Sequence, residues 1–151
     1  MKIKILSESP EETQKIASFY IKHILKSKRL VTKRALVISL EGSLGSGKTE
    51  FLKGIAKALK LKEKVFSPTF IIMKRFKINH KFIKFLWHMD CYRLKSISDL
   101  KELGFHELIN DPHNLIFIEW GDKIKRALPP EHLILKFHII GNNKRKIELM
   151  I

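Results

Sequence analysis

The chain has 151 residues, of which 44% are hydrophobic and 30% charged, and this composition indicates one globular domain over residues 1–151 rather than a disordered chain. Thirty Lys and Arg residues against 15 Asp and Glu give a net charge of +15, and Cys91 is the only cysteine, which excludes a disulfide within the chain. No apolar run approaches the ~20 residues that span a bilayer, and the N-terminal residues lack the apolar core of a secretory signal. We therefore expect a cytoplasmic protein that is not associated with a membrane.

The excess of positive charge is compatible with two interpretations. Only six of the thirty basic residues are Arg, and the Lys residues are spread along the chain rather than clustered. Such enrichment can follow from biased codon usage and form an ordinary solvated surface. A basic surface also raises the rate of encounter with nucleic acid. The charge alone does not distinguish the two.

The first half of the chain predicts a strand, a helix, a buried strand and a second helix. Residues 2–6 alternate as a short strand does. Residues 9–12, Ser-Pro-Glu-Glu, have the pattern of a capping box with Pro at the first helical position. Residues 35–40, ALVISL, form a short unbroken apolar run, as expected of a buried strand, and residues 49–60 have helical spacing. The apolar face of the first helix is expected to hold Ile16, Tyr20, Ile21, Ile24 and Leu25.

The middle of the chain predicts a β-hairpin followed by a helix. Residues 69–78 and 81–92 have the composition of strands, and Asn79 between them is the expected left-handed residue of the turn. The segment Ser96–Asp99 resembles a second capping box, which opens a helix that Gly104 ends.

The last third of the chain predicts another buried strand and a terminal hairpin. Residues 115–120, LIFIEW, repeat the pattern of a buried strand, and residues 132–151 form a hairpin around Gly141, Asn142 and Asn143. Strands joined by hairpins are antiparallel. The predicted fold class is therefore α/β, a single domain with a mixed β-sheet flanked by helices and containing antiparallel hairpins.

The strongest motif is GSLGSGKT at residues 42–49, which satisfies G-x-x-x-x-G-K-[ST] and lies between a buried strand and a helix. Glycines allow successive backbone N–H groups to form an anion-binding nest, and the helix N-terminus adds about half a positive charge. Lys48 can reach the β and γ phosphates, and the Thr49 hydroxyl can ligate Mg²⁺. The loop predicts a P-loop NTPase-like fold that binds a nucleoside triphosphate through Gly42, Ser43, Leu44, Gly45, Ser46, Gly47, Lys48, Thr49 and Glu50.

Two further segments carry polar residues where a P-loop protein needs them. A second carboxylate for the metal usually stands at the end of a neighbouring hydrophobic strand. Glu119 ends LIFIE, and a carboxylate there is costly unless a cation is near. In the segment WHMDCYRL, side chains alternate, so His88, Asp90 and Tyr92 share one strand face. A face this polar borders either a site or solvent.

Taken in order, these motifs resemble those of one family, the bacterial TsaE (YjeE) P-loop ATPases of tRNA threonylcarbamoyladenosine (t6A) synthesis. The resemblance covers nearly the whole chain. The shared patterns are G-x-L-G-x-G-K-T at 42–49, S-P-T-F at 67–70, H-x-D-x-Y-R-L at 88–94, L-G-F-x-E-L at 103–108 and I-E-W at 118–120.

The resemblance implies a Mg²⁺-dependent ATPase, slow without its partners, with ATP and Mg²⁺ as cofactors. It would act with TsaB and TsaD in threonylcarbamoylation of adenosine 37 in tRNAs reading ANN codons, and would reach tRNA only through that complex. Residue by residue, Lys48 would bind phosphate, Thr49 and Glu119 would hold Mg²⁺, and Asp90 would be a catalytic or water-positioning carboxylate. The implied catalytic set is Asp90, Glu119 and Lys48, and the implied switch-like loop is Ser67, Pro68, Thr69 and Phe70.

The sequence departs from the family at Ser46, where alanine is common, and at Glu50, where a second threonine is common. The adenine pocket has two candidate locations, near Ser9 and near Arg145. The rival function is a small P-loop kinase acting on a small-molecule or nucleoside acceptor. Such kinases usually carry an arginine-bearing lid, and here Arg93 is the only arginine placed near a motif. A GTPase is disfavoured because the chain has no N-K-x-D stretch.

Overall fold

The computed structural model describes residues 1–28, 32–62 and 73–151. The chain forms two compact units, and each is described by itself. Both are assembled from segments that are distant in the sequence. The first unit comprises Met1–Ser27, Leu40–Thr69 and Ile134–Ile151, and the second comprises Lys28–Ser39 and Phe70–Leu133.

The described part of the chain contains seven strands in a mixed sheet, and strand β2 (Leu36–Glu41) has residues in both units. The strand order in the first unit is β1-β7-β6-β2, with β1 (Lys2–Ser7), β7 (Arg145–Met150) and β6 (Leu133–Ile139) paired antiparallel. The order in the second is β2-β5-β4-β3. There β5 (Asn114–Glu119) is parallel to β4 (Phe85–Asp90), which is antiparallel to β3 (Met73–Lys77). The predicted α/β fold with a mixed sheet and antiparallel hairpins is confirmed; residues 69–72 of the expected strand lie outside the described residues.

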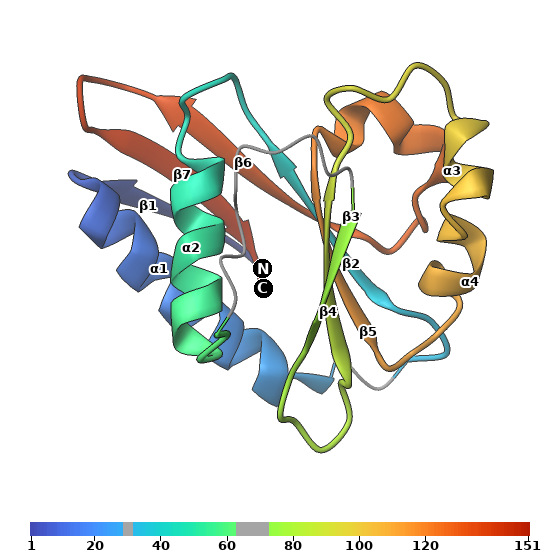
Figure 1. Cartoon of the computed structure of the whole chain (residues 1–151). Helices are drawn as coiled ribbons and strands as arrows, with labels where there is room; N and C mark the ends of the chain where they lie inside the picture. Colours follow the sequence, from blue (N-terminus) through green and yellow to red (C-terminus); the bar gives the residue numbers. More distant parts are fainter. Residues whose placement is uncertain (29–31, 63–72) are drawn as a thin grey trace. The chain divides into compact units, whose positions relative to one another are not determined.

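Two helices of the first unit, α1 (Pro10–Lys26) and α2 (Lys48–Ala58), pack side by side (Figure 1). Ser9 caps α1 as predicted, because its Oγ accepts a hydrogen bond from the Glu12 N–H at 3.1 Å. The Glu12 carboxylate reaches one residue further than a capping box requires and accepts from the Glu8 N–H at 2.6 Å. Of the five residues predicted for the apolar face, Tyr20, Ile21 and Ile24 are buried, whereas Ile16 and Leu25 are only half-buried.

The two helices approach most closely at Gly54 of α2. A Cβ atom there would lie 2.5 Å from the Gln14 carbonyl oxygen and 2.8 Å from Ala17 Cβ, both on α1. Only glycine fits this crossing without displacing backbone. The contact fixes α2 on α1, and α2 begins at Lys48, so it also anchors the end of the glycine-rich loop.

The second unit contains two short helices, α3 (Asp99–Glu102) and α4 (Phe105–Ile109), and the 3-10 helix η2 (Gly121–Ala127). The predicted capping box is half formed. Asp99 accepts from the Ser96 N–H at 3.2 Å, but the Ser96 hydroxyl bonds to the Ser98 hydroxyl instead. Gly104 is left-handed, with φ of 68°, and separates α3 from α4. The predicted helix is therefore a single turn that ends before Gly104, as predicted, and a second one-turn helix, α4, follows it.

Two predicted turns had different outcomes. The prediction that Asn79 is left-handed is wrong, because among the described non-glycine residues only Lys60 and Trp120 have positive φ. The turn is held by His80, whose Nδ1 accepts from the N–H groups of residues 82 and 83 at 3.2 and 3.0 Å. The terminal hairpin is confirmed, since β6 and β7 pair antiparallel across residues 140–144.

The two strands predicted to be buried lie in the core. All residues of β5 are buried, as are the first five of β2. None of the described helices is long and apolar enough to cross a membrane. The core of the second unit includes Ala35, Val37, Met89, Cys91, Leu100, Phe105, Ile116, Ile118, Ile124 and Leu128.

Candidate functional site

The glycine-rich loop, residues 42–49, lies in the first unit between β2 and α2. Gly45 and Gly47 are left-handed, with φ of 76° and 102°. A Cβ atom on Gly45 would meet nothing within 4 Å, so the backbone conformation, rather than crowding, favours glycine there. Gly42 is different, because a Cβ atom there would lie 2.6 Å from Ser46 Oγ and 2.7 Å from the Phe137 carbonyl oxygen. The loop is therefore tightly packed at its start and open at its tip.

Lys48 is the first residue of α2, yet its side chain folds back into the loop. Its Nζ donates to the carbonyl oxygens of Gly42 at 2.7 Å and Ser43 at 3.0 Å, and the residue is only 5% exposed. The N-cap is Gly47, and no described side chain caps the first turn of the helix. A buried ammonium beside an uncapped helix N-terminus is an environment that favours an anion.

Glu50, in the first turn of α2, is held by neighbours on both helices. Its Oε2 accepts from Gln14 Nε2 on α1, and its Oε1 pairs with Lys53 Nζ, both at 2.8 Å. The hydrogen bond from Lys53 is the main reason that the pKa of Glu50 lies below its usual value. Thr49, the neighbouring residue, is exposed. All the residues predicted to contact the nucleotide, 42–50, lie in the first unit.

Arg145, at the start of β7, joins this loop to the terminal hairpin. Its Nη2 and Nε donate to the Gly45 carbonyl oxygen at 3.0 and 3.3 Å. Its Nη1 donates to the carbonyl oxygens of Gly141, Asn142 and Lys144 at 3.0, 3.0 and 2.9 Å. In the sequence, this residue served only to mark one of two possible locations of an adenine pocket. The contact joins residues 100 positions apart, and no sequence motif indicates it.

In the second unit, β4 and β5 bring together three of the polar residues singled out in the sequence. Asp90 and Glu119 are register partners at the ends of these parallel strands. His88 Nε2 lies 2.8 Å from Glu119 Oε2, and the two side chains are 12% and 10% exposed. Glu119 is therefore a carboxylate at a buried strand end, as predicted, and an imidazole holds it in place.

The prediction that Tyr92 shares a strand face with His88 and Asp90 is wrong. Strand β4 ends at Asp90, and Tyr92 lies half exposed in the following turn. Asp90 stabilises that turn, because its Oδ1 accepts from the Tyr92 N–H at 3.0 Å. Cys91 between them is fully buried, and burial raises the pKa of its thiol to about 12.

Trp120, directly after Glu119, is left-handed with φ of 60° and ψ of 37°. This conformation costs a residue with a side chain roughly 1–2 kcal/mol, and such strain is common at functional sites. Its ring lies 5.1 Å from that of Tyr92, and Lys123 Nζ lies 4.8 Å above the Tyr92 ring while donating to the Tyr92 carbonyl oxygen at 2.7 Å. The turn after β4 and the turn after β5 are thereby held together.

Two further points concern the predicted switch-like loop and the possible metal ligands. Ser67, Pro68, Thr69 and Phe70, the expected switch-like loop, lie outside the described residues. Within the described ranges, no group of three or more His, Cys, Asp or Glu residues could hold a metal ion.

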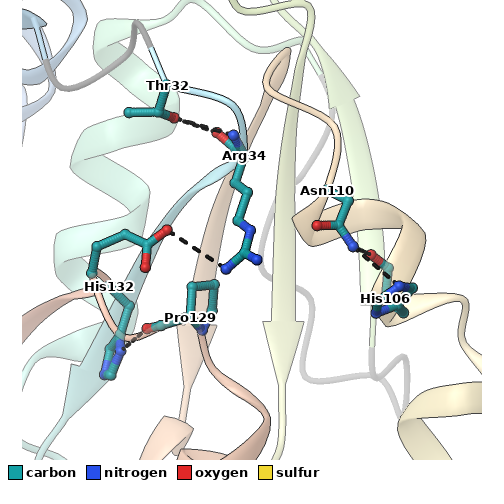
Figure 2. A network of polar contacts seen from close by, with 7 residues as sticks. Thr32, Arg34, His106, Asn110, Pro129 and His132 are labelled. Atoms are coloured by element: carbon teal, nitrogen blue, oxygen red, sulfur yellow. Dashed lines mark hydrogen bonds and ion pairs between the residues drawn. The ribbon is translucent and has the colours of Figure 1, made fainter.

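The second unit also contains a small cavity of about 90 Å³. Two of its lining residues make polar contacts that Figure 2 draws: Glu131 pairs with Arg34 at 3.9 Å, and His132 Nδ1 donates to the Pro129 carbonyl oxygen at 2.7 Å. None of the predicted site residues lines it. The lining residues are Thr32, Ala35, Leu36, Val37, Pro129, Glu131 and His132.

The mixed sheet with flanking helices, and a glycine-rich loop between a buried strand and a helix, place the chain in the P-loop NTPase-like α/β fold class. The crystal structure of YdiB from Bacillus subtilis superposes with a TM-score of 0.68 and 28% sequence identity, covering 99% of this chain and 84% of that one.

Sequence comparisons narrow the class to a family. The profile of the family described as "Threonylcarbamoyl adenosine biosynthesis protein TsaE" matches residues 7–147. A tRNA threonylcarbamoyladenosine biosynthesis protein TsaE from Rickettsia conorii is 36% identical over 91% of this chain and 71% of its own length. Its counterparts from Bacillus subtilis and Aquifex aeolicus are each 34% identical, over 96% and 97% of this chain and 83% and 94% of their own lengths. The chain belongs to the TsaE family.

Proposed function

We propose that this protein binds and hydrolyses ATP with Mg²⁺, and that it acts with TsaB and TsaD in the threonylcarbamoylation of adenosine 37 in tRNAs reading ANN codons. Family membership supports the role in t6A biosynthesis. The single observation that carries nucleotide binding is the loop of residues 42–49, which holds a buried Lys48 ammonium at an uncapped helix N-terminus.

The loop fits a triphosphate in its chemistry. Left-handed glycines at 45 and 47 allow backbone N–H groups to converge, and Lys48 supplies a full positive charge among them. When a phosphate is bound, we expect Lys48 to exchange its contacts with the carbonyls of Gly42 and Ser43 for contacts with phosphate oxygens. The glycine-rich loop is therefore the phosphate subsite of the proposal.

For the metal and the chemistry, we follow the family pattern. Thr49 would offer a hydroxyl and Glu119 a carboxylate to Mg²⁺, which would neutralise phosphate charge when bound. Asp90 would orient the attacking water. His88 would keep the Glu119 carboxylate in one orientation, since the two groups are 2.8 Å apart and nearly buried.

A small P-loop kinase remains the alternative, because it would use the same loop. The two functions differ in what they require. A kinase transfers phosphate to an acceptor without protein partners, whereas a TsaE ATPase is expected to turn over efficiently only with TsaB and TsaD. Phosphorylation of an acceptor by the isolated chain would favour the kinase.

Calorimetry with ATP and Mg²⁺ tests the phosphate subsite. Lys48→Ala should weaken binding strongly, because it removes the motif's only side-chain cation. Lys57→Ala is the matched control, since it removes the same charge from an exposed position in the last turn of the same helix. Equal affinities for Lys48→Ala and the wild type would exclude the phosphate-loop assignment. Co-elution with TsaB and TsaD in ATP but not in ADP would support the partner assignment.

A further inference from the structure

The peptide that joins Gly45 to Ser46 lies at the tip of the glycine-rich loop, between an exposed glycine and a buried serine. Gly45 is exposed and left-handed, and a Cβ atom there would meet nothing within 4 Å. Glycine rotates about its backbone bonds at low cost. On the Gly45 side, the orientation of this peptide therefore depends on hydrogen bonds rather than on crowding.

Arg145 supplies hydrogen bonds to one side of this peptide. Two of its guanidinium nitrogens donate to the Gly45 carbonyl oxygen, at 3.0 and 3.3 Å. Its third nitrogen donates to three carbonyl oxygens of the β6–β7 turn. That turn is closed by antiparallel pairing, including the bond from the Ile140 N–H to the Lys144 carbonyl oxygen at 3.1 Å. The guanidinium thus ties the loop tip to a hydrogen-bonded hairpin.

The other side of the same peptide faces the loop. In a trans peptide the C=O and N–H groups point in opposite directions. Because Arg145 holds the Gly45 carbonyl outward, the Ser46 N–H points inward, where it donates to the Ser43 carbonyl oxygen at 3.1 Å. The Ser43 carbonyl also accepts from Lys48 Nζ at 3.0 Å, so this N–H lies next to the loop's cation.

We propose that Arg145 is a positioning residue of the phosphate-binding loop: it fixes the Gly45–Ser46 peptide so that the Ser46 N–H is directed at a bound phosphate. The proposal rests on the phosphate-binding function proposed above. Arg145 acts through the backbone, and the planar fork of the guanidinium is what allows it to bond the loop and the hairpin at once. A lysine has the charge without the fork.

Two substitutions separate geometry from charge. Arg145→Ala should weaken ATP binding by about tenfold or more, since hydrogen bonds from a charged donor are the strong ones. Arg145→Lys should recover little of the loss, because one ammonium cannot bridge both partners. Added ethylguanidinium should restore part of the affinity of Arg145→Ala and leave Arg145→Lys unchanged. Arg126→Ala is the matched control, as Arg126 is an exposed residue of η2 in the other unit.

A measurement without nucleotide keeps the inference separate from the proposed function. Amide hydrogen exchange, resolved by NMR, should show faster exchange at Ser46 in Arg145→Ala than in the wild type and Arg126→Ala. Failure of the wild type to bind ATP would overturn the proposed function. The exchange rate of the Ser46 amide would still show whether Arg145 holds the Gly45–Ser46 peptide. Wild-type exchange at Ser46, or wild-type ATP affinity in Arg145→Ala, would overturn the role of Arg145. Full recovery of ATP affinity in Arg145→Lys would show that the planar guanidinium is not needed.

Discussion

Gly54→Ala tests whether the helix that ends the glycine-rich loop is fixed by its crossing with α1. Alanine is favoured over glycine inside a helix by about 1 kcal/mol. The added methyl would lie 2.5 and 2.6 Å from backbone atoms of Gln14 and 2.8 Å from Ala17 Cβ. Backbone atoms of Gln14 cannot move aside from the added methyl as a flexible side chain could. We therefore take the upper end of the usual overpacking cost, about 3 kcal/mol. The net expectation is a loss of about 2 kcal/mol, because steric cost exceeds helix propensity.

Thermal and denaturant unfolding measure this loss. For a chain of this length, 2 kcal/mol lowers Tm by roughly 4–8 °C. Gly141→Ala is the matched control: its Cβ would meet only the Lys144 side chain, at 3.4 Å or more, so a neutral or slightly stabilising effect is expected. Because α2 begins at Lys48, Gly54→Ala should also weaken ATP binding. An unchanged or higher Tm would refute the close crossing.

Three further predictions address the chemistry. Asp90→Asn should still bind ATP but hydrolyse it ~10²–10⁴-fold more slowly in the presence of TsaB and TsaD; wild-type turnover would remove Asp90 from the mechanism. The Cys91 thiol, whose pKa is raised to about 12 by burial, should react with Ellman's reagent only after unfolding, and rapid labelling of the native protein would contradict its burial. The isolated chain should bind tRNA weakly, with a slope of about −0.9 in log K against log salt for each neutralised duplex phosphate. Tight, salt-resistant binding would instead show that the basic surface itself recognises RNA.

Local patterns in the sequence predicted the elements and the loop, because these depend on neighbouring residues. Unbroken apolar runs identified β2 and β5, and the Ser9 side chain caps α1 as the sequence suggests. The motif at residues 42–49 predicted a loop between a buried strand and a helix, and the structure places it between β2 and α2, with Gly45 and Gly47 left-handed. In each case the signal and the structure lie within a few residues of each other.

Local patterns failed where a neighbouring side chain made the expected contact instead, or where a strand ended earlier than its periodicity suggests. Asn79 was expected to turn the hairpin by its conformation, but the His80 ring accepts two backbone N–H groups and holds the turn without a left-handed residue. Ser96 was expected to cap a helix, but its hydroxyl bonds to Ser98. Strand periodicity predicted Tyr92 on the same face as His88 and Asp90, but β4 ends at Asp90. The Asp90 carboxylate accepts a hydrogen bond from the Tyr92 N–H in the turn that follows.

The sequence by itself indicated the candidate site residues: a glycine-rich loop, a carboxylate at a buried strand end, and a histidine and an aspartate on one strand. Only the tertiary structure decided how they are held. His88 meets Glu119 across 31 residues because β4 and β5 are parallel neighbours, and Arg145 meets Gly45 across 100 residues because β7 belongs to the same unit as the loop. Side chains paired over such separations leave no local periodicity. Their contacts follow from which strands are neighbours in the sheet and from where the chain turns.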